Sequence, residues 1–250
     1  MTQSDEWPVT AGDYRDALRK LIVGWKLLLE RHPINVQSEN RRTALLVAGW
    51  VAQVHRYGRA FLQLEKVGLE HEAHPLVRSA LEHCVVAQAG DAAVTTRYAL
   101  DQAQLGKFAK LSAGSPHDVV APPWDAALVA GMVDGNPPQP VDEFKFMGNF
   151  ADICDRIGMK SSLYTVYQVE CALTHPTTNS SGVFLTPDDQ HIKAEPTTGQ
   201  EGGLVSMMAH SVYWARRVLA DLMVDHLYDD WLEDIAASIQ VASRLPPIQF

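Results

Sequence analysis

Charged residues are rare between residues 75 and 90, and those present are close enough to act together. The segment is predicted to be a helix, and at about 100° per residue its faces are apolar apart from Arg78, Glu82 and His83. Arg78 and Glu82 are four residues apart, a spacing that lets a guanidinium and a carboxylate pair on one helix face. Because a charge removed from water is costly unless it is paired, these side chains are expected to find polar partners inside the fold.

A second predicted helix, residues 161–174, has the same character. Its one charged residue is Glu170, and it is followed by His175, at the end where the helix dipole favours a cation. Both helices are therefore expected to be buried and to share their few ionisable groups. The predicted internal cluster consists of Arg78, Glu82, Glu170 and His175, with His83 and Tyr167 beside it.

This cluster supports two interpretations. In the first, it is a structural ion-pair network that fixes the register of the two helices. In the second, it binds an unknown small ligand or protein partner, because perturbed ionisable groups gather at functional sites.

The two helices that carry the cluster resemble a known family. Residues 75–83, Pro-Leu-Val-Arg-Ser-Ala-Leu-Glu-His, and residues 164–176, which begin with Tyr and end in Thr-His-Pro, are similar to the signature helices of the domain-of-unknown-function family 5677. The resemblance covers residues 38–180 and implies a helical protein with no known enzymatic activity. Where the family has a serine a few residues before the histidine, this sequence has Cys171 and Thr174.

The spacing from Arg78 to His83 also resembles the Arg-x(4–6)-His motif of the HEPN superfamily of helical nucleotide-binding domains. That resemblance implies a metal-independent ribonuclease of stress or phage defence, in which His83 serves as general acid or base and Arg78 stabilises charge on the phosphate. Five residues correspond to about 140° round a straight helix, so the two side chains would converge across a homodimer or at a distorted helix start. RNA contact is expected only under this alternative.

No metal site and no cofactor are predicted. His71 and His74 are three residues apart, but two adjacent ligands without a distant third are typical of a polar loop. The sequence has no glycine-rich phosphate loop, no Gly-x-Ser-x-Gly motif and no paired Glu-x-x-His helices.

Hydrophobic periodicity predicts an all-α, multi-helix bundle formed by a single domain over residues 1–250. Prolines and glycines mark an insertion at residues 112–140, and residues 181–195 are predicted to form a small β-hairpin. The adjacent Arg216 and Arg217 are interpreted as solvated helix charges. The predicted helices are 11–31, 38–67, 75–89, 92–111, 141–157, 161–174, 204–227 and 231–244.

Composition and charge exclude several classes of function. The 250 residues carry 21 basic and 30 acidic side chains, a net charge of −9, which argues against broad nucleic-acid binding. The three cysteines are too few and too scattered for a disulfide framework or a thiolate zinc site. Without a signal-like start or an apolar run of about 20 residues, we expect a cytoplasmic protein with no membrane span.

Overall fold

The computed structural model describes residues 8–31, 35–37, 41–88, 149–186, 191–193, 195–196 and 201–249. Within these ranges the chain is predominantly helical and contains no strand, as the all-α prediction requires. Its α-helices are α1 (Ala11–Arg31), α2 (Arg41–Lys66), α3 (His74–Gln88), α6 (Phe150–Arg156), α7 (Thr165–Thr174), α8 (Thr178–Gly182), α9 (Glu201–Leu222) and α10 (Asp229–Ser238).

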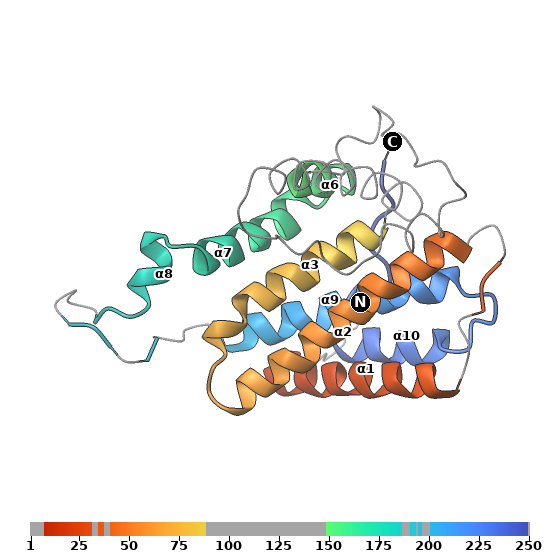
Figure 1. The fold of residues 1–250 in the computed structure, drawn as a ribbon, viewed down its shortest axis with the longest axis horizontal. Coiled ribbons are helices and arrows are strands. Elements are labelled where there is room, and N and C mark those ends of the chain that lie inside the picture. Colours follow the sequence, from red (N-terminus) through yellow and green to blue (C-terminus); the bar gives the residue numbers. More distant parts are fainter. Residues whose placement is uncertain are drawn as a thin grey trace, which may run out of the picture.

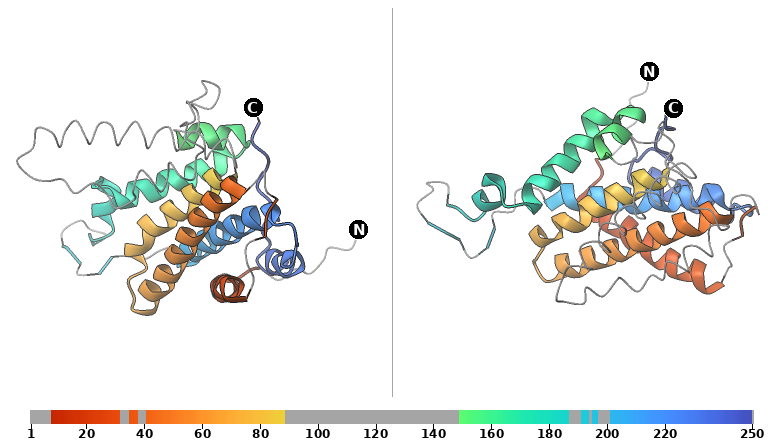
Figure 2. Two further views of the ribbon diagram at one scale, coloured as in Figure 1. Left: turned by 45° about the vertical axis from the view of Figure 1, so that its right-hand side comes forward. Right: turned by 45° about the horizontal axis from the view of Figure 1, so that its top comes forward.

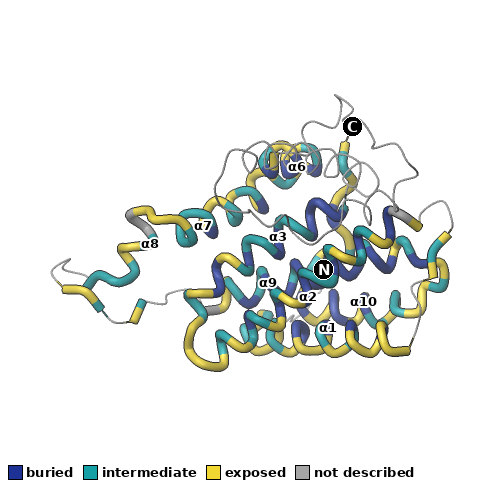
Figure 3. Tube along the Cα trace, viewed as in Figure 1, coloured by how far each residue is buried: buried dark blue, intermediate teal, exposed yellow. Residues whose placement is uncertain are grey.

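The bundle is built around α3 and α9, which pack against each other (Figure 1). Helix α2 contacts both of them, α1 packs on α2 and α9, and α10 lies beside α1 and α9. Helix α7 packs on α3, with α6 at the end of α3. Because other helices cover them, α3 and α9 carry many of the buried apolar residues of the described bundle (Figure 3).

The periodicity of the sequence explains this core. Helix α1 buries Leu18, Leu21, Trp25 and Leu28, which recur at helical spacing, and leaves its charged residues outside. Helix α3 buries His74, Val77, Ala80, Leu81, Cys84, Val85, Val86 and Ala87.

The ends of several helices follow local sequence signals. Thr10 and Asp13 bond reciprocally at the start of α1, since the Asp13 carboxylate accepts from the Thr10 amide at 2.8 Å and Thr10 Oγ1 accepts from the Asp13 amide at 3.3 Å. Helix α2 ends at Lys66, and Gly68, predicted as its stop, lies two residues later with a φ of 77°. The following amide, that of Leu69, donates back to the carbonyl of Leu64 at 2.9 Å.

Helix α7 differs from its prediction as a core helix. Its only buried residue is Glu170, and Val169 is 46% exposed. The helix follows a π-helical turn, Lys160–Tyr164, and packs one face on α3, while α8 projects away from the bundle (Figure 2). An apolar sequence on every side was thus a misleading signal, because among the described helices of the bundle α7 packs on α3 with one face.

The region predicted as a β-hairpin, residues 181–195, is described only in part. Residues 181 and 182 belong to α8, and the pairing seen is one isolated antiparallel bridge between Leu185 and Ile192. The Lys193 amide donates to the carbonyl of Phe184 at 2.7 Å. The predicted insertion at 112–140 and the predicted helix at 92–111 lie outside the described residues.

Candidate functional site

The seam between α3 and α7 holds a polar cluster centred on Arg78. From α3, the Arg78 guanidinium reaches α7, where Nη2 donates to the hydroxyl of Tyr167 at 3.2 Å. Its Nη1 lies 3.2 Å from Nε2 of His175, the residue that caps the end of α7. The guanidinium carbon lies 5.1 Å from the centre of the Tyr167 ring, within range of a cation–π contact. Three of the predicted residues therefore meet, although they lie far apart in sequence.

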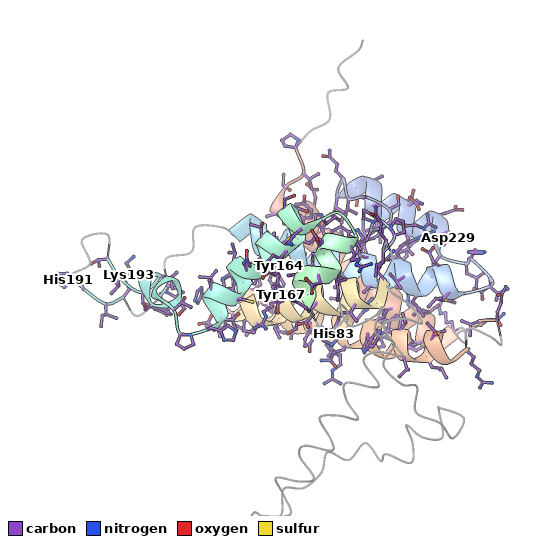
Figure 4. The ribbon with its side chains drawn as sticks, turned by 90° about the horizontal axis from the view of Figure 1, so that it is seen from above. His83, Tyr164, Tyr167, His191, Lys193 and Asp229 are labelled. Atoms are coloured by element: carbon purple, nitrogen blue, oxygen red, sulfur yellow. The ribbon has the colours of Figure 1, made fainter. Side chains whose placement is uncertain are left out.

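Aromatic packing positions the Tyr167 ring. The centroid of the Phe150 ring, at the start of α6, lies 4.3 Å from the centroid of the Tyr167 ring. The centroid of the Tyr164 ring, three residues before Tyr167, lies 6.2 Å from it. Tyr164 and Tyr167 are close together in the view from above, far from His191 and Lys193 (Figure 4). Tyr167 thus presents its hydroxyl to Arg78 from a ring that is supported by two neighbours.

The contact between Arg78 and His175 defines the state of the histidine. An arginine N–H always donates, so His175 Nε2 must accept, which requires a neutral ring protonated on Nδ1. The sequence had suggested a cationic histidine favoured by the helix dipole. In the structure the side chain is exposed and serves as an acceptor for a cation instead.

The charges near the seam shift the pKa values of both partners. Burial alone lowers the pKa of Arg78, but the hydrogen bond with Tyr167 and the charges of Cys171 and Glu82 outweigh it, so the pKa is raised. The pKa of Tyr167 is also raised, because its burial and the nearby Glu82 outweigh the stabilising effect of Arg78 on the phenolate. Glu82 thus acts on the cluster electrostatically, as expected from its position one turn after Arg78.

Glu170 does not join Arg78. Its Oε2 atom lies 2.6 Å from Nδ1 of His74, one turn before Arg78 on α3, and both side chains are buried. The ring of His71 lies 5.0 Å from that of His74 and 5.7 Å from that of Phe184. The predicted single cluster is therefore two adjacent groups, and His74 is a member that the sequence analysis had considered only as a metal ligand.

His83 faces a different helix. Its Nδ1 atom lies 2.7 Å from the carbonyl oxygen of Ser79, and its ring packs edge-on against Tyr57 of α2, with centroids 5.7 Å apart. Arg78 instead contacts α7. Arg78 and His83 are both partly exposed, but within one chain Arg78 contacts α7 and His83 contacts α2.

The interpretation of Arg216 and Arg217 as solvated charges is wrong. Arg217 is 4% exposed and forms ion pairs with Asp221 at 2.9 Å, Asp229 at 3.3 Å and Glu233 at 3.4 Å. Its partners come from α9 and α10, so this residue joins the two helices. The sequence indicated one of these ion pairs, because Asp221 follows Arg217 by four residues and so lies on the same helix face.

Arg216 is 1% exposed and has no ion pair among the described residues. Its guanidinium carbon lies 5.1 Å from the ring of Trp25 and 5.3 Å from that of Tyr228, while Nε and Nη1 are buried without a hydrogen-bond partner in the structure. Burial lowers its pKa to about 10, and Tyr228 only partly opposes this. On the bundle side of α1, the Trp25 ring also stacks on His55 of α2 at 4.6 Å.

Three further findings bound the function. Comparison with known proteins gives no match, whether to a protein-family model, a curated protein or a solved structure. In the part of the chain that the structure describes, no group of three or more His, Cys, Asp or Glu side chains is placed to hold a metal ion. None of the described helices has both the length and the hydropathy needed to cross a membrane. The resemblances to family 5677 and to the HEPN superfamily remain predictions.

Proposed function

We propose that this chain is a helical binding protein that recognises an anionic group of a small ligand or partner at the Arg78 cluster. The proposal depends on which side chains hydrogen-bond to Arg78 and to Glu170 where α3 and α7 pack together. The described hydrogen bonds of Arg78 go to neutral acceptors, the Tyr167 hydroxyl and His175 Nε2, while the nearby Glu170 carboxylate is engaged by His74. Arg78 is partly exposed, so an incoming carboxylate or phosphate could replace His175 and form a stronger, charge-assisted bond.

Binding at a guanidinium can be tested directly by NMR. The Arg78 Nε–H resonance is followed while the protein is titrated with inorganic phosphate and, separately, with acetate. We expect a saturable shift of Arg78, accompanied by shifts of the His175 ring. Arg78→Met should remove the shift of His175, and Arg31→Met, a change on the exposed end of α1, should leave it. Equal, unsaturable shifts at Arg78 and at Arg31 in the unaltered protein would reject the proposal.

A metal-independent ribonuclease is the second candidate, and one observation favours it. Arg78 and His83 are both partly exposed rather than sealed in the core. Because they contact different helices, a nuclease site would need Arg78 of one copy to approach His83 of another. RNA cleavage by the unaltered protein, lost in both Arg78→Ala and His83→Ala, would support this function, and equal rates in all three proteins would reject it.

A further inference from the structure

A groove between α1 and α2 has the features of a second binding site. It has a volume of about 740 Å³, within the range of small-molecule pockets. Its walls are largely apolar, with Ile22 and Trp25 from α1 and Ala52 from α2, and His55 also lines it. This groove is remote from Arg78 in both sequence and helix pairing, so it is independent of the function proposed above.

One side chain that lines the groove, His55, has a polar atom without a partner among the described residues. His55 is 3% exposed, and its Nδ1 atom lies 2.8 Å from the carbonyl oxygen of Val51, which makes Nδ1 the protonated nitrogen. Nε2 is therefore a lone-pair acceptor, and it is buried with no hydrogen-bond partner among the residues that the structure describes. A buried acceptor left without a hydrogen bond is unfavourable, and a donor on a bound molecule would satisfy it.

The surroundings keep this histidine an acceptor. Burial lowers the pKa of His55 to about 3, and although the bond to Val51 raises it, the nearby Arg216 lowers it further. A neutral ring cannot donate from Nε2, so the groove selects a hydroxyl or an N–H at this point rather than a bare carboxylate oxygen.

The rim of the groove is cationic. Arg56 and Arg59 of α2 are exposed, and neither has an ion-pair partner among the residues that the structure describes. Lys26, on the α1 side, is 3.7 Å from Glu30 and so is already paired. On a chain with a net charge of −9, two adjacent free arginines beside an apolar groove favour an anion.

We propose that this groove binds an organic acid whose anionic group pairs with Arg56 and Arg59 while a hydroxyl or N–H on its apolar body donates to His55. The helix sets the separation of the two groups, since Arg59 follows His55 by four residues, or about 6 Å along α2. A single aromatic ring with a carboxylate at one end and a hydroxyl at the other spans that separation. Because Nε2 is covered in the unliganded protein, entry requires the Trp25 ring stacked on His55 to shift.

The test uses three small probes and the full chain. They are 4-hydroxyphenylacetate, phenylacetate, which lacks the hydroxyl, and 4-hydroxyphenylacetamide, which lacks the charge. Binding is followed by calorimetry and by tryptophan fluorescence. We expect the hydroxy acid to bind about tenfold more tightly than either analogue, as one lost polar interaction predicts. The fluorescence change should be absent in Trp25→Phe.

Substitutions separate the two recognition elements. Arg59→Gln should weaken binding of the hydroxy acid but not of the amide, whereas Arg31→Gln, outside the groove, should change neither. His55→Asn keeps a donor for Val51 and removes Nε2, so it should abolish the preference for the hydroxyl. If that variant does not fold, the comparison of the three probes on the unaltered protein still decides. Equal affinities for hydroxy acid and phenylacetate, or no binding of any probe, would overturn the proposal.

Discussion

The Nδ1 atom of His74 lies 2.6 Å from Oε2 of Glu170, and the two residues are 96 positions apart. The pair joins the first turn of α3 to α7, a helix with no other buried residue. The side chains are 11% and 7% exposed, so neither can turn to water without moving its helix. This contact, together with the Arg78 cluster, holds α7 against the bundle.

Replacing Glu170 should therefore loosen α7. Glu170→Ala leaves His74 buried without its partner, and we expect the free energy of unfolding to fall by about 3 kcal/mol. Glu170→Gln retains an acceptor and should cost less. Denaturant unfolding measures both changes, and Glu30→Ala, which removes an exposed partner of Lys26, is the matched control with an expected effect below about 1 kcal/mol. An equally small effect at Glu170 would show that the pair contributes little.

The Arg78–Tyr167 contact can be weighed separately from ring packing. Tyr167→Phe keeps the ring against Phe150 and removes the hydroxyl that accepts from Arg78, so we expect a loss of about 1 kcal/mol. A double-mutant cycle with Arg78→Met should give a coupling energy of at least about 0.5 kcal/mol. Strictly additive losses in the cycle would mean that the two side chains do not interact in solution.

The neighbouring arginines of α9 should respond in opposite directions. Arg217→Met leaves three carboxylates without their shared cation and should destabilise the protein by several kcal/mol. Arg216→Met removes a buried cation whose pKa burial lowers to about 10. The relief of about 3 kcal/mol exceeds the lost cation–π contacts, so we expect a net gain of about 1 kcal/mol. Thermal unfolding of both variants tests this, and a lower Tm for Arg216→Met contradicts it.

Buried His55 and partly buried His210 predict a loss of stability in mild acid. Burial lowers the pKa of His55 to about 3 and that of His210 to about 4, whereas both have a value of 6.5 in the unfolded chain. Between these values the unfolded chain binds protons that the folded protein does not. The free energy of unfolding should thus be unaffected above pH 6.5 and fall below it, by about 1.4 kcal/mol per pH unit for each histidine.

The contribution of one histidine can be isolated from the rest. We expect His55→Asn to reduce the slope of stability against pH between 6.5 and 4 by about 1.4 kcal/mol per unit. Urea unfolding across this range gives the slope for each protein. His226→Asn, the same change at an exposed histidine, is the control for the effect of the substitution itself. Parallel curves for His55→Asn and the unaltered protein would place His55 in contact with water.

Hydrophobic periodicity predicted the bundle because the buried residues of a helix recur in the sequence every three or four positions. The bounds of α1 match the predicted 11–31, and α2 ends at Lys66, two residues before Gly68, whose positive φ suits the end of a helix. Helix α7 shows the limit of this signal. Its composition is apolar, but composition does not show how many neighbouring helices pack against a helix.

The candidate site was predictable in part for the same reason. Few charges on two apolar helices pointed to Arg78, Tyr167 and His175, which do meet. The sequence could not reveal that Glu170 pairs with His74, because the choice between His74 and Arg78 depends on the axial position of α7 along α3. Nor could it distinguish Arg216 from Arg217, whose burial follows from the packing of α1 and α10 against α9.

The last residues of the chain lie across the ends of helices distant in sequence. Leu245 is buried, and its carbonyl accepts from Gln88 at the end of α3, while Gln249 exchanges hydrogen bonds with Arg156 of α6. Residues 245–249 therefore connect the end of α3 to the end of α6. Removing residues 245–249 would remove both contacts and would leave the Gln88 and Arg156 ends of these helices without them.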